Sequence, residues 1–283
     1  YVRNYGFEAM LSYGHRWGDF GWDSSFTFSA NKNEIVELVK DYVHPETGKT
    51  YNVDKLELKT DEGRGFGKAK FILKEGGTLG DLYTHADLKR DINGNILIDD
   101  SGNVTAIDNA GDIKLGSVLP KANLAWNNSF SYKGINAGFL LTARLGGIVY
   151  SATQAYLDLY GVSETSAAAR DAGGVWINGR SHVNPQSFYE VVASQSGLPT
   201  YYTYSATNLR LQEAHIGYTI PRRWLGNVCD INVSLVGRNL WMIYCKAPFD
   251  PEAVATTNNY YQGIDYFMMP STRNIGFNIK INF

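Results

Sequence analysis

The stretch NIGFNIKINF, residues 274–283, carries the pattern that decides the fold of this chain. Its apolar members are Ile275, Phe277, Ile279, Ile281 and Phe283. Because successive side chains of a strand point to opposite faces, the pattern predicts one apolar face and one polar face. In an outer-membrane barrel the apolar face contacts lipid and the polar face lines the lumen, but the terminal strand of a soluble β-sandwich can alternate in the same way. The stretch alone leaves both interpretations open.

The composition of the chain favours β-structure and excludes some classes of protein. Its 283 residues, 44% of them hydrophobic and 19% charged, suit one large β-domain or two ordinary ones. The 19 tyrosines and 29 glycines are typical of strands, turns and membrane interfaces rather than of helices. With a net charge of −2, we expect no nucleic-acid partner. The apolar runs are too short for a transmembrane helix, whereas a barrel needs no such run.

The spacing of the alternating stretches predicts about nine strands whose connections differ in length. Short connections are expected near 14–19, 74–77, 133–134 and 221–227, and long ones near 30–62, 89–120, 151–203 and 245–265. Short and long connections alternate, which places all the long ones at the same edge of the sheet. Bacterial outer-membrane barrels have short periplasmic turns and long extracellular loops. The fold class is therefore all-β, an antiparallel transmembrane β-barrel.

The number of strands indicates that the barrel is incomplete. Phe66–Leu73 and Thr78–Leu88 are counted here as one pair of wall strands. A bacterial barrel built from one chain closes with an even number of strands, and an odd sheet leaves two unpaired edges. We therefore expect residues 1–283 to be the C-terminal segment of a larger barrel.

Several motifs, in order along almost the whole chain, resemble one family. They are ATNLRLQEAHIGYTIPRRWLG (206–226), INVSLVGRNLWMIY (231–244) and FDPEA (249–253), with supporting stretches at 6–38, 79–88 and 114–150. Followed by a terminal strand that ends in Phe, they look like the end of a SusC/RagA-type TonB-dependent transporter. The resemblance implies a barrel of about 22 strands in the outer membrane of a Gram-negative bacterium. The plug domain, the TonB-contacting part and the N-terminal barrel strands of that family are absent from these residues.

The same resemblance implies a function and a set of partners. The function is import of oligosaccharides or peptides together with a SusD-like surface lipoprotein that acts as a lid. The partners are this lid, the remainder of the barrel and its plug, TonB through the absent N-terminal part, outer-membrane lipid and the barrel-assembly machinery. The final strand is expected to serve as the assembly signal, with Phe277, Ile279, Ile281 and Phe283 as the row presented.

One polar loop resembles the start of an oxygen-ligand loop for calcium. The candidate ligands are Asp91, Asn93, Asn95 and Asp99. Calcium loops of the D-x-N-x-D-G type require a glycine where Ile96 stands, so a turn without metal is the favoured interpretation. We expect no cofactor.

The long loops are rich in aromatic side chains that could contact cargo or the lid. These are Tyr156, Tyr160, Trp176, Tyr201, Tyr202, Tyr260 and Tyr261. Aromatic faces with polar neighbours often hold sugars and peptides, but loop residues also pack against each other. Both interpretations stay open for each residue.

Three other functions compete with import. A secreted β-sandwich module that binds carbohydrate would use tyrosine and tryptophan platforms without contacting a membrane. A barrel enzyme would need a nucleophile and a base, and the sequence contains no such motif, so no catalytic residue is expected. A passive porin fits the wall, but the family resemblance argues against it.

Overall fold

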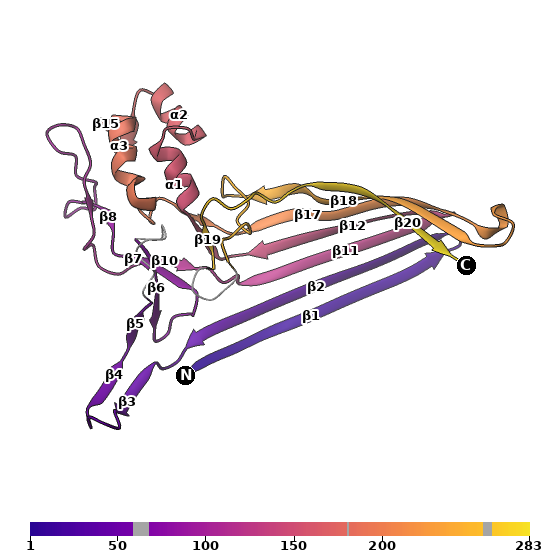
Figure 1. The fold of residues 1–283 in the computed structure, drawn as a ribbon, viewed down its shortest axis with the longest axis horizontal. Helices are drawn as coiled ribbons and strands as arrows, with labels where there is room; N and C mark the ends of the chain where they lie inside the picture. The colour runs from indigo at the N-terminus through magenta and orange to yellow at the C-terminus, as the bar shows by residue number, and fades with distance from the viewer. Residues whose placement is uncertain (59–67, 180, 257–261) are drawn as a thin grey trace.

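The computed structural model describes residues 1–58, 68–179, 181–256 and 262–283, and its main element is a long antiparallel sheet (Figure 1). We call this seven-stranded sheet the wall, and its strand order is β1-β2-β11-β12-β17-β18-β20. The strands are β1 (Val2–Trp17), β2 (Phe20–Ile35), β11 (Ala122–Tyr132), β12 (Ile135–Leu145), β17 (Asn208–Ile220), β18 (Asp230–Cys245) and β20 (Asn274–Asn282). Each wall strand pairs with the next one along the chain, as in an up-and-down barrel.

The pairing register sorts the side chains of the wall onto two faces. Ile281 lies opposite Ile231, Ile279 opposite Val233, and Phe277 opposite Leu235, so the alternation of β20 continues into β18. The same register continues across all seven strands and produces one apolar face and one polar face. The predicted strand faces are therefore confirmed.

The apolar face lies open. On β20, Phe277 is 77% exposed and Ile279 is 55% exposed. In the described part of the chain, no second sheet packs against these side chains. A soluble β-sandwich buries such a face against its other sheet, so the sandwich alternative does not fit this structure.

Short and long connections occupy opposite ends of the wall, as predicted for 14–19, 133–134 and 221–227 (Figure 1), whereas the turn predicted near 74–77 lies outside the wall, within one of the long connections. Gly18 with Asp19, Lys133 with Gly134, and a turn around η2 (Arg222–Trp224) form the short end. Lys133 and Gly134 have φ of 47° and 88°, the left-handed pair that a tight type I′ hairpin turn requires. The described residues of the connections 36–121, 146–207 and 246–273 meet at the other end and form what we call the external layer.

The prediction of about nine wall strands is wrong by one pair. The described residues of Phe66–Leu73 and Thr78–Leu88 belong to the external layer. Their two longer strands lie in a separate sheet of order β10-β7-β6-β5. The strands of this sheet are β5 (Lys55–Glu57), β6 (Ala69–Lys74), β7 (Asp81–Thr84) and β10 (Ile113–Ser117). With six and four residues, β6 and β7 are shorter than the roughly 9–11 residues that cross a membrane. All four residues of β7 are buried, which fits a core and not a barrel wall.

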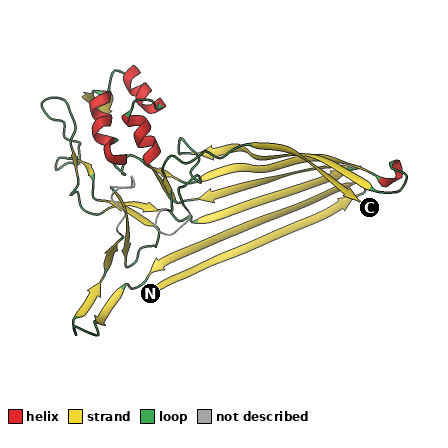
Figure 2. Ribbon diagram, viewed as in Figure 1, coloured by secondary structure: helices red, strands yellow, loops and turns green. Residues whose placement is uncertain are grey.

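The α-helices of the described residues all lie in the external layer, whereas the 3₁₀ helix η2 lies at the short end of the wall (Figure 2). The α-helices are α1 (Ala152–Leu159), α2 (Glu164–Asp171) and α3 (Pro185–Val192). Ser151, Ser163 and Asn184 each cap one helix, because their side-chain oxygens accept hydrogen bonds from backbone amides of the first turn. None of the described helices is long and apolar enough to cross a membrane.

Short strands complete the external layer and enclose its core. They are β3 (Val39–Val43), β4 (Thr50–Val53), β8 (Asp87–Leu88), β9 (Ala106–Ile107), β13 (Ile148–Ser151), β14 (Val175–Ile177), β15 (Ser181–Val183), β16 (Thr203–Ser205) and β19 (Ile264–Asp265). Phe71, Leu82, Tyr150 and Ile264 are fully buried in one cluster. The Tyr150 hydroxyl donates a 2.5 Å hydrogen bond to the Ser196 carbonyl, which satisfies its polar end.

Candidate functional site

The polar face of the wall offers hydrogen-bonding and charged groups without tyrosine, tryptophan or phenylalanine rings. In the seven wall strands, all of which the structure describes, every tyrosine, tryptophan and phenylalanine falls on the apolar face by register. The polar face carries serine, threonine, asparagine and charged side chains, among them an ion pair of Glu213 and Arg238 at 2.9 Å. A solute passing along this face would meet polar groups, and aromatic contacts would have to come from the external layer.

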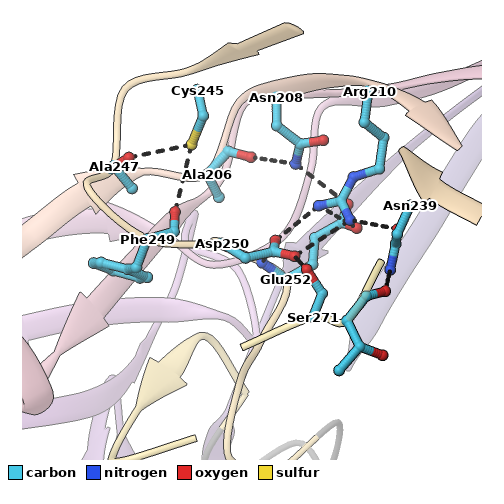
Figure 3. Close-up of polar contacts among 11 residues, drawn as sticks. Ala206, Asn208, Arg210, Asn239, Cys245, Ala247, Phe249, Asp250, Glu252 and Ser271 are labelled. Atoms are coloured by element: carbon cyan, nitrogen blue, oxygen red, sulfur yellow. Dashed lines mark hydrogen bonds and ion pairs between the residues drawn. The ribbon is translucent and has the colours of Figure 1, made fainter. Parts of the chain in front are cut away.

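A buried ion pair joins the outer end of the wall to the connection 246–273 (Figure 3). Arg210 on β17 holds Asp250 through both terminal nitrogens, with Nη2–Oδ1 at 2.7 Å and Nη1–Oδ2 at 3.3 Å. The two side chains are 7% and 9% exposed, respectively. Glu252 adds a second carboxylate 3.1 Å from Arg210 Nη2. The FDPEA motif is therefore fastened to the polar side of the wall by a bidentate guanidinium–carboxylate pair.

The far end of the same connection is attached at the same place. Ser271 Oγ donates to Asp250 Oδ2 at 2.5 Å, and Asn239 Nδ2 donates to the Thr272 carbonyl at 3.4 Å. Asn239 sits at a bulge of β18 with φ of 52°, which turns its side chain towards Arg210 (Figure 3). We call Arg210, Asp250, Glu252, Ser271 and Asn239 the mouth latch.

The charge state of Asp250 depends on the latch. Burial alone would raise the pKa of its carboxyl group, but hydrogen bonds from Arg210 and Ser271 outweigh burial and hold the pKa below its usual range. Asp250 therefore stays ionised at neutral pH. Nothing in the local sequence spacing marks this site, because Arg210 and Asp250 are 40 residues apart.

The aromatic residues expected to contact cargo or a lid fall into different environments. Tyr160 is 74% exposed and Trp176 is 60% exposed, with the Trp176 ring 4.0 Å from that of His182. Tyr156 packs against Phe267 with the rings tilted and their centroids 5.4 Å apart. Of these three, Tyr160 and Trp176 are the most open to a ligand.

Tyr201 and Tyr202 pack inwards instead. Tyr201 is half-buried and lies edge-on to Phe188, with centroids 6.2 Å apart. Tyr202 is 2% exposed and donates its hydroxyl hydrogen to Asp158 Oδ2 at 3.0 Å. Burial, and then the Asp158 carboxylate, raise the pKa of Tyr202, so it remains a neutral donor in the core. Tyr260 and Tyr261 lie outside the described residues.

The candidate calcium loop consists of two turns that close on their own carboxylates. Asp91 Oδ1 accepts hydrogen bonds from the backbone amides of Asn93 and Asn95, both at 2.8 Å. Asp99 Oδ1 accepts in the same way from Ser101 at 2.9 Å and Asn103 at 2.8 Å. The Asn95 side chain also donates to Asp91 and lowers its pKa. Both aspartates thus serve as turn-closing residues, and calcium binding by this loop stays a prediction.

The residues expected to form the assembly signal lie together at one edge of the wall. Phe277, Ile279 and Ile281 share the apolar face of β20, and Phe283 follows directly after the strand. Phe283 is 87% exposed. The row is therefore presented as predicted, and its role in assembly remains a prediction.

Curated relatives are TonB-dependent receptors, although no family model matches the chain. The chain is 25% identical over 289 residues to TonB-dependent receptor P3 of Formosa agariphila, an alignment that covers 93% of this chain and 27% of the relative. It is 25% identical over 308 residues to TonB-dependent receptor P26 of the same organism, covering 100% of this chain and 29% of that protein. The chain thus spans less than a third of these relatives, and the resemblance drawn from its motifs is confirmed.

Solved structures give the same result for the fold. A structure of the RagAB peptide importer in the "closed-closed" state matches with a TM-score of 0.66 and 18% identity over 100% of this chain and 30% of that chain. A structure of the RagAB peptide transporter matches with a TM-score of 0.65 and the same identity over 29% of its chain. The wall therefore has the fold of part of a transporter barrel.

Proposed function

We propose that this chain, similar to TonB-dependent receptors along nearly its whole length, forms part of the wall and external mouth of an outer-membrane importer. The observation that carries the proposal is the wall, whose open apolar face and polar face are separated by register across all seven strands. Lipid would solvate the apolar face, and the polar face would line the conduit. The long connections, gathered at one end, would form the extracellular surface of a Gram-negative outer membrane.

The proposed importer needs further parts beyond the described wall. Within the described residues, β1 pairs only with β2 and β20 only with β18, so each has one unpaired edge that other barrel strands would cover. Residues 1–283 would then be the C-terminal segment of a TonB-dependent barrel that also has a plug domain and takes its energy through TonB. A SusD-like lipoprotein would close the external mouth over an oligosaccharide or peptide. The role is transport and not catalysis, because the similar proteins are receptors and importers.

Cysteine labelling on adjacent residues of β20 tests which face meets lipid. In a background with Cys229→Ser and Cys245→Ser, Asn278→Cys should react with a membrane-impermeant maleimide in outer-membrane fragments. Ile279→Cys, one position along, should stay unlabelled until detergent removes the lipid. Equal labelling of both cysteines before detergent is added would show that no lipid covers the apolar face, and the proposal would fail.

The terminal strand is proposed to guide assembly through its apolar row. Phe283→Asp places a charge at the end of that row, and we expect at least a several-fold lower yield of folded protein in outer-membrane fractions. Asn282→Asp is the matched control, because it adds the same charge to the polar row. An undiminished yield for Phe283→Asp would contradict the assembly role.

A further inference from the structure

A pocket of about 370 Å³ opens on the polar face at the outer end of the wall. Its lining comes from β2, β11, β12 and β17 together with the latched connection 246–273. The polar groups that the pocket presents include Thr27, Asn123, Thr142, Arg144, Gln212 and Glu252. A volume near the lower end of the range for small-molecule sites suits one sugar unit or one amino-acid residue.

Arg144 is the one cationic side chain in this lining, and not all of its N–H donors have an acceptor among the described residues. Its Nη2 donates to the Val118 carbonyl at 2.7 Å. Its Nε is buried and has no hydrogen-bond partner among the described residues. A guanidinium has five N–H donors in a planar fork, and a buried donor without a partner is costly. Because Nε is enclosed, a solute in the pocket would reach Arg144 through the terminal N–H groups of the fork that do not donate to Val118.

The hydrogen bonds of Glu252 go to residues other than Arg144. Glu252 Oε2 lies 3.1 Å from Arg210 Nη2, and Glu252 Oε1 accepts from Asn208 Nδ2 at 3.3 Å. The Glu252 side chain is nevertheless 40% exposed and has further lone pairs for a donor within the pocket. The pocket thus combines a guanidinium that donates only to the Val118 carbonyl among the described residues with a carboxylate that can still accept.

We propose that this pocket binds a carboxylate of the imported solute, with Arg144 on the carboxylate and Glu252 on a neighbouring N–H or O–H group. Two kinds of solute carry this pair of groups: the last residue of a peptide, with its backbone N–H, and a uronic-acid sugar, with its ring hydroxyls. A guanidinium fork matches the two oxygens of a carboxylate better than it matches a single hydroxyl or amide oxygen. The proposal deepens the importer function and rests on it, because it names the chemistry of the cargo.

Binding of matched probes to the complete, detergent-purified transporter tests the site. The probes are a tetrapeptide with a free C-terminal carboxylate, the same peptide as its amide, a diuronate, and the corresponding neutral disaccharide. We expect Arg144→Gln to weaken binding of at least one carboxylate probe about tenfold or more and to leave the neutral probes unchanged. If the peptide pair shows this loss, the carboxylate is that of a peptide. If the sugar pair shows it, the carboxylate is that of a uronic acid. Arg144→Lys keeps the charge without the fork and should give an intermediate loss.

Control measurements separate this site from a general loss of charge or of folding. Arg16→Gln removes the same cation from the polar face of β1, near the opposite end of the wall, and should leave all affinities unchanged. The heat-modifiable band of a folded barrel on gel electrophoresis verifies each variant. The proposal is overturned if wild type binds no carboxylate probe more tightly than its neutral counterpart. It also fails if Arg144→Gln weakens all probes equally. Uptake of the same probes by cells tests the importer function separately. If the purified protein binds a probe through Arg144 but cells do not import that probe, the binding site is supported and the importer function is refuted.

Discussion

The wall and the external layer treat their apolar residues in opposite ways. On the wall, Phe277 is 77% exposed and Leu235 is 55% exposed. In the external layer, Phe71 and Leu82 are fully buried. The buried hydrophobic cluster of the described chain consists entirely of residues outside the seven wall strands. One chain therefore contains a region built like a water-soluble domain and a region whose apolar surface faces outwards.

The two regions are stabilised in different surroundings. The external layer excludes water from its own side chains and is held by burial of apolar surface. In the wall, strand pairing satisfies the backbone polar groups, and the apolar side chains need acyl chains around them. A substitution of the same chemical kind should thus have different effects in the two regions.

Removal of a large core side chain should give the largest effect. Phe71→Ala leaves a cavity in the external layer and should destabilise it by about 3–5 kcal/mol. Phe26→Ala, the matched change on the apolar face of β2, should cost much less, because lipid chains can fill the space. Hydrogen–deuterium exchange of the external layer in the purified protein measures the first effect, and the thermal stability of the heat-modifiable barrel band measures the second. Equal losses at both positions would mean that the wall has a protein core of its own.

A buried charge on the apolar face should give the next largest effect. Leu235→Arg lies near the middle of β18, where an arginine facing lipid costs about 2–4 kcal/mol. Val236→Arg places the same residue one position along, on the polar face, and should insert normally. The yield of folded protein in outer-membrane fractions checks both variants. If Val236→Arg were the more damaging of the two, the assignment of the faces would be reversed.

The wall could be predicted from the sequence because its rule is local. Strands such as Asn274–Asn282 alternate with period two, and a single register carries that alternation from strand to strand. The sequence of the external layer has no such local pattern. Phe71 and Tyr150 meet in one core although they come from distant stretches, and the run FILK around Phe71 resembles a wall strand until its neighbours are known. The error of one strand pair arose there.

The candidate site divides in the same way. The exposed positions of Tyr160 and Trp176 agree with their place in long loops, whereas Tyr202 belongs to the core because Asp158 and the surrounding helices enclose it. Local signals for two further helices were present, since Ser163 before Glu164 and Asn184 before Pro185 are good helix starts. The latch between Arg210 and Asp250 had no local signal, because a bulged strand and a distant loop create it.

The mouth latch, which joins the two regions, should show the smallest of these effects. Asp250→Asn removes one anion from the buried Arg210 and should loosen the connection 246–273 by about 1–3 kcal/mol. Hydrogen–deuterium exchange at residues 246–256 and 262–273 should then be faster. Asp100→Asn, an exposed aspartate elsewhere in the external layer, should change nothing there.

The pH dependence of the latch follows from the lowered pKa of Asp250. A carboxyl group whose pKa is lower in the folded protein contributes stability above its unfolded value, about 4, and loses it as the pH falls through the folded value. In wild type, exchange at 246–256, corrected for its intrinsic pH dependence, should be constant from pH 8 to pH 5 and should rise only below about pH 4. Asp250→Asn should lack this acid transition. A transition in exchange near neutral pH, or one that persists in Asp250→Asn, would show that another group controls the pH dependence of this connection. The wall and the external layer would then be joined by a different contact.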